Sequence, residues 1–186
     1  MLNIEVFNMF DPMYCDQYIA MAEKRGFEES KVNTYGVQVE NKSIRNNSRM
    51  FFESPGMAHM LWGILKNHIP KEYEGKKLTR IGDYFRIYKY EAGQYFKAHK
   101  DGSVELPGEA SLLTMLIYLS DSEAGTTLMP YGPSQEWAYK KIECTKGKIL
   151  IFDHGLWHKG DTVTSGAKYV LRTDIFYTCD TLVNTV

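Results

Sequence analysis

The hydrophobic periodicity of the chain changes near residue 84, and this change constrains the fold more than any other feature. Beyond it, apolar and polar residues alternate with a period of two in short runs separated by glycines, a pattern typical of strands joined by turns. We predict strands over residues 84–90, 95–101, 112–119, 126–129, 148–152 and 168–177. Many short strands that follow helices predict a mainly β fold, a sandwich or jelly roll supported by N-terminal helices.

Two helices are predicted before this region. In the first, Asp11 has the position of an N-cap, Pro12 opens the helix and Gly26 ends it. In the second, Ser54 is the cap and an apolar stripe extends toward Pro70. The segment between them, about residues 30–50, is long and polar. We expect its part 46–49 to be either a lid that faces substrate or a solvated turn.

Length and composition restrict the class of protein. A chain of 186 residues fits a single domain over 1–186, with helical support over about 1–75 and a β core over about 80–180. The net charge of −1 lacks the basic excess of a nucleic-acid binder. Three widely spaced cysteines form no disulfide framework, and no apolar run has membrane-spanning length, so we expect a cytoplasmic protein without a membrane partner. The oligomeric state stays open.

One pair of residues suggests a metal site. His99 and Asp101 lie two positions apart on a predicted strand, so their side chains point the same way. A second histidine would complete two imidazoles and one carboxylate on one face of an octahedron, with three positions left open, as in non-haem iron(II) oxygenases. His154 and His158 are the candidates, whereas His59 and His68, assigned to the second helix, are expected at the surface.

The residue that favours His158 is a lysine that follows it. Lys168 lies ten positions later and opens the last predicted strand, where Arg172 shares its face. A cation that points inward must be paired, because an unpaired buried charge is very costly. The far carboxylate of a dicarboxylate cosubstrate would supply the partner. The alternative for Lys168 is a side chain that faces solvent. Separately, Arg172 could form its ion pair with Asp101 or with Asp174.

The order His-x-Asp, distant histidine and basic residue ten positions later resembles the iron(II)/2-oxoglutarate-dependent oxygenases, and within them the prolyl 4-hydroxylase-like branch. The resemblance extends over about residues 84–177, with the stretches 86–102, 116–119, 125–128, 147–152 and 158–169 as its main support. It implies a double-stranded β-helix, a distorted jelly roll of cupin-like form.

The resemblance also assigns roles. It implies that the iron ligands are His99, Asp101 and His158, that Lys168 binds 2-oxoglutarate with Arg172 as the alternative base, and that a tyrosine hydrogen-bonds the cosubstrate. That tyrosine is Tyr90, with Tyr88 as the alternative. Halogenating relatives carry a small residue at the position of Asp101, so the carboxylate here indicates hydroxylation.

The implied function is hydroxylation of an unactivated C–H bond in a peptidyl or free amino acid. It requires Fe(II), 2-oxoglutarate, O2 and possible support by ascorbate, and it yields succinate and CO2. Two alternatives stay open at this point. One keeps the chemistry but takes a small metabolite or a nucleobase as substrate, and the other is a non-catalytic jelly-roll binding module.

Overall fold

Both helices begin at the capping residues that the sequence indicates. In the computed structural model, which describes residues 5–34 and 37–179, α1 spans Pro12–Arg25 and α2 spans Pro55–Leu65. The Asp11 carboxylate accepts a hydrogen bond from the Met13 amide at 2.8 Å, and the Ser54 hydroxyl accepts one from the Met57 amide at 3.2 Å. These bonds satisfy amides that the first turn leaves without a partner.

The second helix ends earlier than predicted. It stops at Leu65, so the assignment of His68 to this helix was wrong and His68 lies in the turn that follows. In this turn the amides of His68 and Ile69 both donate to the Leu65 carbonyl, at 2.8 and 3.1 Å, so the regular helical pattern is lost before Pro70. His59 and His68 are both exposed, as predicted.

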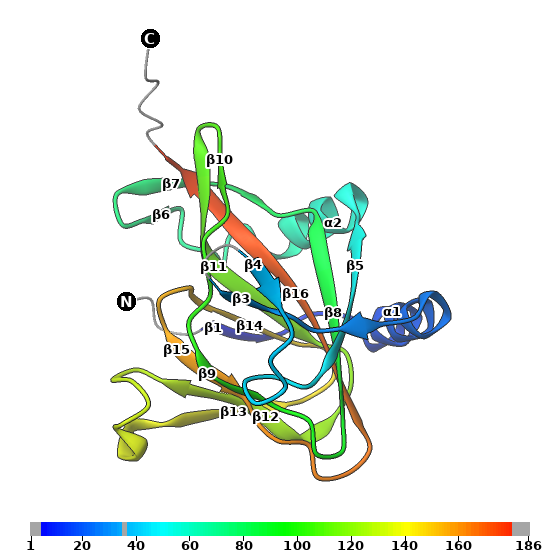
Figure 1. Ribbon diagram of the computed structural model, residues 1–186. Coiled ribbons are helices and arrows are strands. Elements are labelled where there is room, and N and C mark those ends of the chain that lie inside the picture. Colours follow the sequence, from blue (N-terminus) through cyan, green and yellow to red (C-terminus); the bar gives the residue numbers. More distant parts are fainter. Residues whose placement is uncertain (1–4, 35–36, 180–186) are drawn as a thin grey trace.

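The strands form two facing sheets (Figure 1). The main path of the larger, ten-stranded sheet runs, in spatial order, through β1 (Glu5–Asn8), β14 (Lys148–Asp153), β11 (Glu109–Tyr118), β16 (Ala167–Thr178), β8 (Tyr84–Glu91), β5 (Ser48–Glu53) and β2 (Glu28–Glu29). Off this path, β10 (Glu105–Leu106) pairs with β11, β7 (Lys76–Ile81) pairs with β16, and β6 (Glu72–Tyr73) pairs with β7.

The smaller sheet has the order β13 (Lys140–Cys144), β12 (Ser122–Met129), β15 (Trp157–Gly160) and β9 (Phe96–His99). A separate hairpin joins β3 (Val32–Thr34) and β4 (Val37–Val39), and a short 3-10 helix spans Glu136–Ala138. All the paired strands of the described residues run antiparallel.

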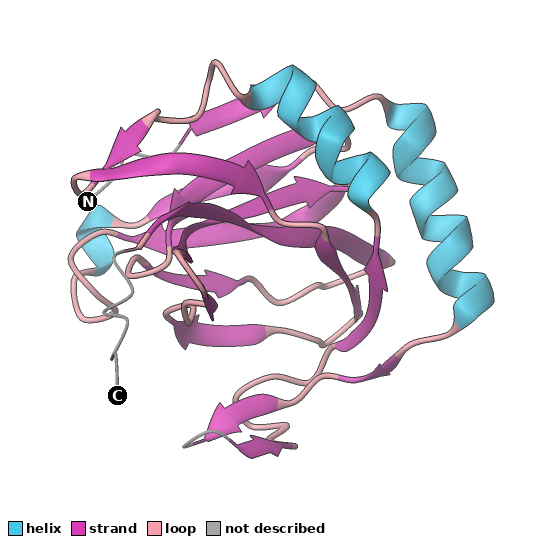
Figure 2. Ribbon diagram, turned by 90° about the horizontal axis from the view of Figure 1, so that it is seen from above, coloured by secondary structure: helices cyan, strands magenta, loops and turns pink. Residues whose placement is uncertain are grey.

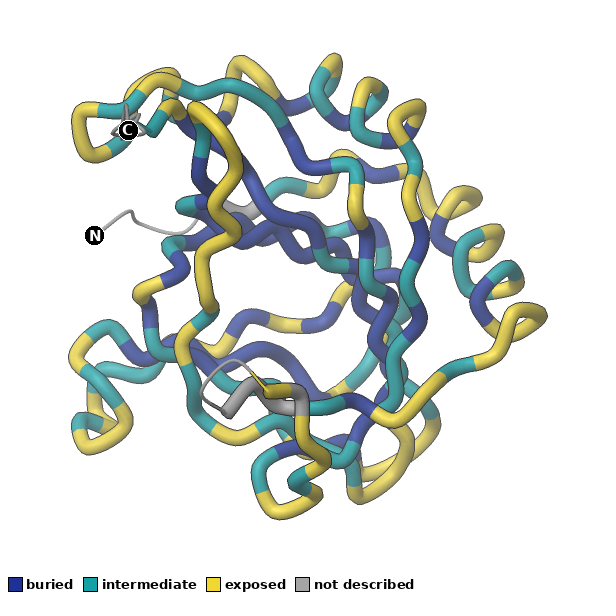
Figure 3. Tube along the Cα trace, turned by 45° about the horizontal axis from the view of Figure 1, so that its top comes forward, coloured by how far each residue is buried: buried dark blue, intermediate teal, exposed yellow. Residues whose placement is uncertain are grey.

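The period-two alternation divides each central strand between two apolar layers. On β11, Met115 and Ile117 point to the face that the helices cover, where they share a buried cluster with Leu61 of α2. Leu116 and Tyr118 of the same strand point to the opposite face, where they pack with residues of the smaller sheet. Figure 2 shows the helices along one side of the larger sheet, and Figure 3 shows buried chain between the layers.

The predicted fold class is confirmed as a double-stranded β-helix supported by helices. All six predicted strands are present, but the strand predicted over residues 95–101 ends at His99, so Asp101 lies beyond it. The three cysteines are free, as predicted. In the described part of the chain, no helix has the length and apolar character needed to cross a bilayer.

Candidate metal centre

Strand pairing in the smaller sheet brings two distant histidines together. β9 and β15 run antiparallel, and His99 is the direct cross-strand partner of His158. Their ring centroids lie 4.1 Å apart. Asp101 lies two residues past the end of β9, where its amide donates a hydrogen bond to the carbonyl of His154 at 2.9 Å. This backbone bond holds the carboxylate beside the two imidazoles.

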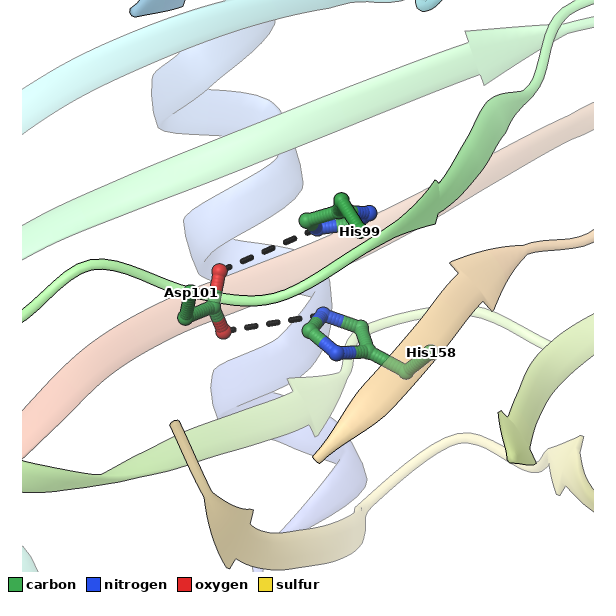
Figure 4. Close-up of side chains that lie close together, drawn as sticks. All are labelled: His99, Asp101 and His158. Atoms are coloured by element: carbon green, nitrogen blue, oxygen red, sulfur yellow. Dashed lines mark ion pairs between the residues drawn. The ribbon is translucent and has the colours of Figure 1, made fainter. Parts of the chain in front are cut away.

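The three side chains converge, as Figure 4 shows. The Nε2 atom of His99 lies 3.8 Å from Oδ1 of Asp101, and Nε2 of His158 lies 3.6 Å from Oδ2. One donor atom from each residue can be chosen so that all three lie within 4.8 Å of one another. The donor set of two imidazoles and one carboxylate suits a first-row metal ion such as iron(II). The sequence prediction therefore names three residues that the fold does bring together.

Backbone carbonyls fix the orientation of both imidazoles. Nδ1 of His99 lies 2.8 Å from the Lys97 carbonyl, and Nδ1 of His158 lies 2.9 Å from the Leu156 carbonyl. A carbonyl only accepts, so each Nδ1 carries the proton and each Nε2 offers a lone pair toward Asp101. Burial, reinforced by the neighbouring His158, lowers the pKa of His99 to about 3, and burial also lowers the pKa of His158. Both rings are therefore neutral at neutral pH, as metal binding requires.

The Asp101 carboxylate is ionised despite its burial. Burial alone would raise its pKa, but the Arg172 guanidinium, with its Nη1 2.7 Å from Oδ1, holds the pKa well below the usual range. The Thr114 hydroxyl donates a further hydrogen bond to Oδ2 at 2.6 Å. Arg172 also donates through Nη2 to Asp174 at 3.2 Å. Both of the predicted acidic partners of Arg172 are thus confirmed.

A pocket extends from the three residues toward the predicted cosubstrate residues. Lys168, Arg172, Tyr88 and Tyr90 all line it together with His99, Asp101 and His158. The alternative that Lys168 faces solvent is wrong, because its side chain is 1% exposed. Its Nζ donates to the Gly125 carbonyl at 2.6 Å and lies 5.3 Å from the centre of the Tyr90 ring. Within the described ranges, no carboxylate forms an ion pair with this ammonium group.

Both predicted tyrosines are buried in the pocket wall. Tyr90 is 5% exposed, and burial raises the pKa of its hydroxyl to about 12, so it is a neutral donor. Tyr88 differs, because burial would raise its pKa but the guanidinium groups of Arg172 and Arg45 lower it. These cations make the pocket around Tyr88 electropositive.

The polar segment between the helices packs against two residues that line the pocket, Tyr88 and Phe96. Arg45 is buried, with its guanidinium 4.0 Å from the Phe96 ring centre and 5.1 Å from that of Tyr88. Phe96 in turn stacks on His99, with ring centroids 3.5 Å apart. The expectation of a solvated turn at 46–49 is wrong, because Asn47 is buried and β5 begins at Ser48. Residues 35 and 36 of the longer segment lie outside the described residues.

Three contributors were not predicted from the sequence, namely Thr114, Arg45 and Phe96. Thr114 had a signal, because it interrupts an apolar run at an inward-facing position of β11. Phe96 had none, because strand alternation places residues 96 and 99 on opposite faces. An irregular register between β9 and β15 brings their rings together. His154, the other candidate ligand, is buried beside Thr114, with Nδ1 2.8 Å from its hydroxyl, and is not one of the three converging residues.

The comparisons with known proteins agree with this geometry. The profile of the 2OG-Fe(II) oxygenase superfamily matches residues 85–174, a range that contains every predicted site residue. No curated protein matches the chain.

Several solved structures share the fold at low sequence identity. A viral collagen prolyl hydroxylase of Paramecium Bursaria Chlorella virus-1, in complex with 2OG, is 21% identical, with a TM-score of 0.61 over 93% of this chain and 95% of that one. A Pseudomonas putida prolyl-4-hydroxylase is 14% identical, with a TM-score of 0.67 over 92% and 91%. A Trichoplax adhaerens prolyl hydroxylase, in complex with a hypoxia inducible factor peptide fragment, is 14% identical, with a TM-score of 0.70 over 95% and 83%.

The fold and the site define a 2-oxoglutarate-dependent dioxygenase. Over residues 85–174 the chain matches the 2OG-Fe(II) oxygenase superfamily. The cofactors of this family are Fe(II), 2-oxoglutarate and O2.

Proposed function

We propose that this chain hydroxylates an unactivated C–H bond in a peptidyl or free amino acid, in the manner of a prolyl hydroxylase, and releases succinate and CO2. The observation that carries the proposal is the convergence of His99, Asp101 and His158 at one end of a pocket that has Lys168 in its wall. The likeness in fold to prolyl hydroxylases, one of them described with a peptide, supports an amino-acid substrate.

In this proposal His99, Asp101 and His158 hold iron(II). The bound metal, with 2-oxoglutarate and O2, supplies the oxidative chemistry, in which one oxygen atom enters the C–H bond and the other enters succinate. The chain's own share is to keep both Nε2 atoms unprotonated and aimed at the carboxylate, through the carbonyls of Lys97 and Leu156.

Lys168 is the proposed anchor for the far carboxylate of 2-oxoglutarate. Its ammonium group is buried, and among the described residues its only hydrogen-bond partner is a neutral carbonyl, so an anionic ligand would supply the charge that it lacks. Arg172 is the weaker candidate, because its guanidinium already contacts two carboxylates, Asp101 and Asp174. Tyr90, next to Lys168 in the pocket, is the proposed hydroxyl donor.

The first test is turnover of 2-oxoglutarate to succinate with iron(II), O2 and ascorbate. We expect the unmodified chain to give succinate, His99→Ala to give none, and His59→Ala, which replaces an exposed histidine of α2, to behave like the unmodified chain. Full turnover by His99→Ala would refute the assigned site. The substrate is then sought by mass spectrometry, as the peptide or amino acid that gains one oxygen atom.

A further inference from the structure

Asp101 belongs to a closed ring of five buried or half-buried polar side chains. Arg172 contacts one oxygen of Asp101 at 2.7 Å, and Thr114 donates to the other at 2.6 Å. Arg172 also donates to Asp174 at 3.2 Å. His154 completes the ring of neighbours, because its Nδ1 lies 2.8 Å from the Thr114 hydroxyl and its Nε2 lies 4.0 Å from Asp174 Oδ1, which is too long for a hydrogen bond.

The hydrogen bonds beside this ring have one consistent direction. An ionised carboxylate only accepts, so the Thr114 hydroxyl gives its proton to Asp101 and accepts one from Nδ1 of His154. Nε2 of His154 is then an acceptor, and the Ser111 hydroxyl, 3.0 Å away, donates to it while accepting from the Val104 amide at 2.8 Å. The chain of donors leaves the Asp101 carboxylate a single preferred orientation.

Arg172 is the cationic member of the ring. It presents one Nη atom to Asp101 and the other to Asp174, and Asp174 is also paired with Arg86 at 3.2 Å. Two carboxylates thus face two guanidinium groups. The planar guanidinium fork bridges the two carboxylates, so its contact with Asp174 sets the direction from which its other Nη atom meets Asp101, which a single ammonium group does less well.

We propose that Arg172 is a positioning residue of the metal centre, whose fork holds the Asp101 carboxylate in the rotation that faces the two histidines. Asp101 needs such support because it follows the end of β9, where its position is set by one backbone bond and its side chain. The inference rests on the proposed function, since it assumes that Asp101 binds the metal.

The response to Arg172→Lys separates positioning from simple charge. If Arg172 acted only as a nearby positive charge, a lysine would replace it without loss of affinity for a divalent cation. If Arg172 positions Asp101, its removal weakens binding, and loss of such outer contacts typically lowers metal affinity about 10–100-fold.

The experiment is a titration with Mn(II) alone, without 2-oxoglutarate, followed by the electron paramagnetic resonance signal of the free ion. We expect Arg172→Met to bind Mn(II) about 10–100-fold more weakly than the unmodified chain. Arg172→Lys, which keeps the charge and loses the fork, is expected to be weakened as well. The matched control is Lys140→Met, which removes an exposed cation of β13 outside the pocket and should leave the affinity unchanged.

Each outcome decides a different point. Equal or tighter Mn(II) binding by Arg172→Met overturns the positioning role and leaves the proposed function intact. Failure of the unmodified chain to bind Mn(II) or Fe(II) overturns the proposed function itself. If Arg172→Met does not fold, Asp174→Ala replaces it, because this change removes the acceptor that holds the second Nη atom. Weaker binding by Asp174→Ala supports the inference, and unchanged binding refutes it.

Discussion

Replacing Lys168 with methionine removes one of the two cations that line the pocket and keeps most of the buried volume of the side chain. Lys168 is 1% exposed, so bulk water has little access to the position that its charged Nζ occupies. If Lys168 anchors 2-oxoglutarate, the variant loses a hydrogen bond between two charged groups. Such a bond contributes about 1.5–3 kcal/mol, which corresponds to a dissociation constant about 10–150-fold larger.

The effect on folding should be smaller than the effect on binding. The Gly125 carbonyl loses one of its two donors but keeps the Asp161 amide at 3.2 Å, so the lost hydrogen bond costs only about 0.5–1.5 kcal/mol. The same change removes a buried cation, whose pKa is lowered by burial, and this relief offsets part of the cost. A variant that stays folded but binds 2-oxoglutarate poorly is therefore the expected result.

The assay is calorimetric titration of the Mn(II)-loaded protein with 2-oxoglutarate in the absence of oxygen. Lys140→Met is the control, because Lys140 is exposed on β13 and its replacement should leave binding unchanged. Binding by Lys168→Met that equals that of the unmodified chain refutes the anchor role. If Arg172→Met loses 2-oxoglutarate while retaining Mn(II), Arg172 is the anchor and Lys168 was chosen wrongly.

Two further predictions concern stability. Burial lowers the pKa values of His99, His154 and His158, so below about pH 6.5 the unfolded chain binds protons that the folded chain does not bind. The metal-free protein should therefore lose stability as the pH falls, by up to about 1.4 kcal/mol per pH unit for each histidine. Urea unfolding between pH 7.5 and 5.5 tests this, and a free energy of unfolding that does not change with pH contradicts it. Gly147→Ala should destabilise the fold by more than Gly166→Ala. Both glycines have positive φ, which costs about 1–3 kcal/mol for alanine, but only at Gly147 would the added Cβ also lie 2.4 Å from the Phe10 carbonyl oxygen. Equal thermal unfolding temperatures of the two variants would contradict this steric argument.

Strands with buried apolar side chains could be predicted from the sequence, and strands that are held mainly by backbone pairing could not. The predicted strands around β11, β14 and β16 carry alternating apolar residues on both sides of the larger sheet. In contrast, β7 and β13 begin with two lysines each, and β15 has four residues, one of them His158. In such strands the ladder of backbone hydrogen bonds, which leaves no trace in side-chain hydrophobicity, decides the structure.

The site was predictable where it depends on order and spacing along the chain. His99, Asp101 and His158 follow from a short motif and a distant histidine, and Lys168 follows from its distance to His158. The partners of Asp101 were only partly predictable, because Thr114 and Arg172 reach it from two other strands. Which of their atoms meet is set by the register of β11 against β16, where Thr114 pairs with Asp174 and Leu116 with Arg172. Register depends on the packing of the whole sheet and not on any local pattern.

In the proposed assignment one strand supplies cations for two separate tasks, and its geometry gives a reason why they should not substitute for each other. Lys168 and Arg172 lie on the same face of β16, four residues apart, which is about 13 Å along an extended strand. That span separates the guanidinium, which contacts Asp101, from the ammonium group, which contacts Gly125. A cosubstrate that bridges from metal to anchor would need a charged group at each end, as a keto dicarboxylate has. Because the two cations are fixed to one rigid strand, a swap of Lys168 and Arg172 should restore neither metal positioning nor 2-oxoglutarate binding, although it conserves the charge of the pocket.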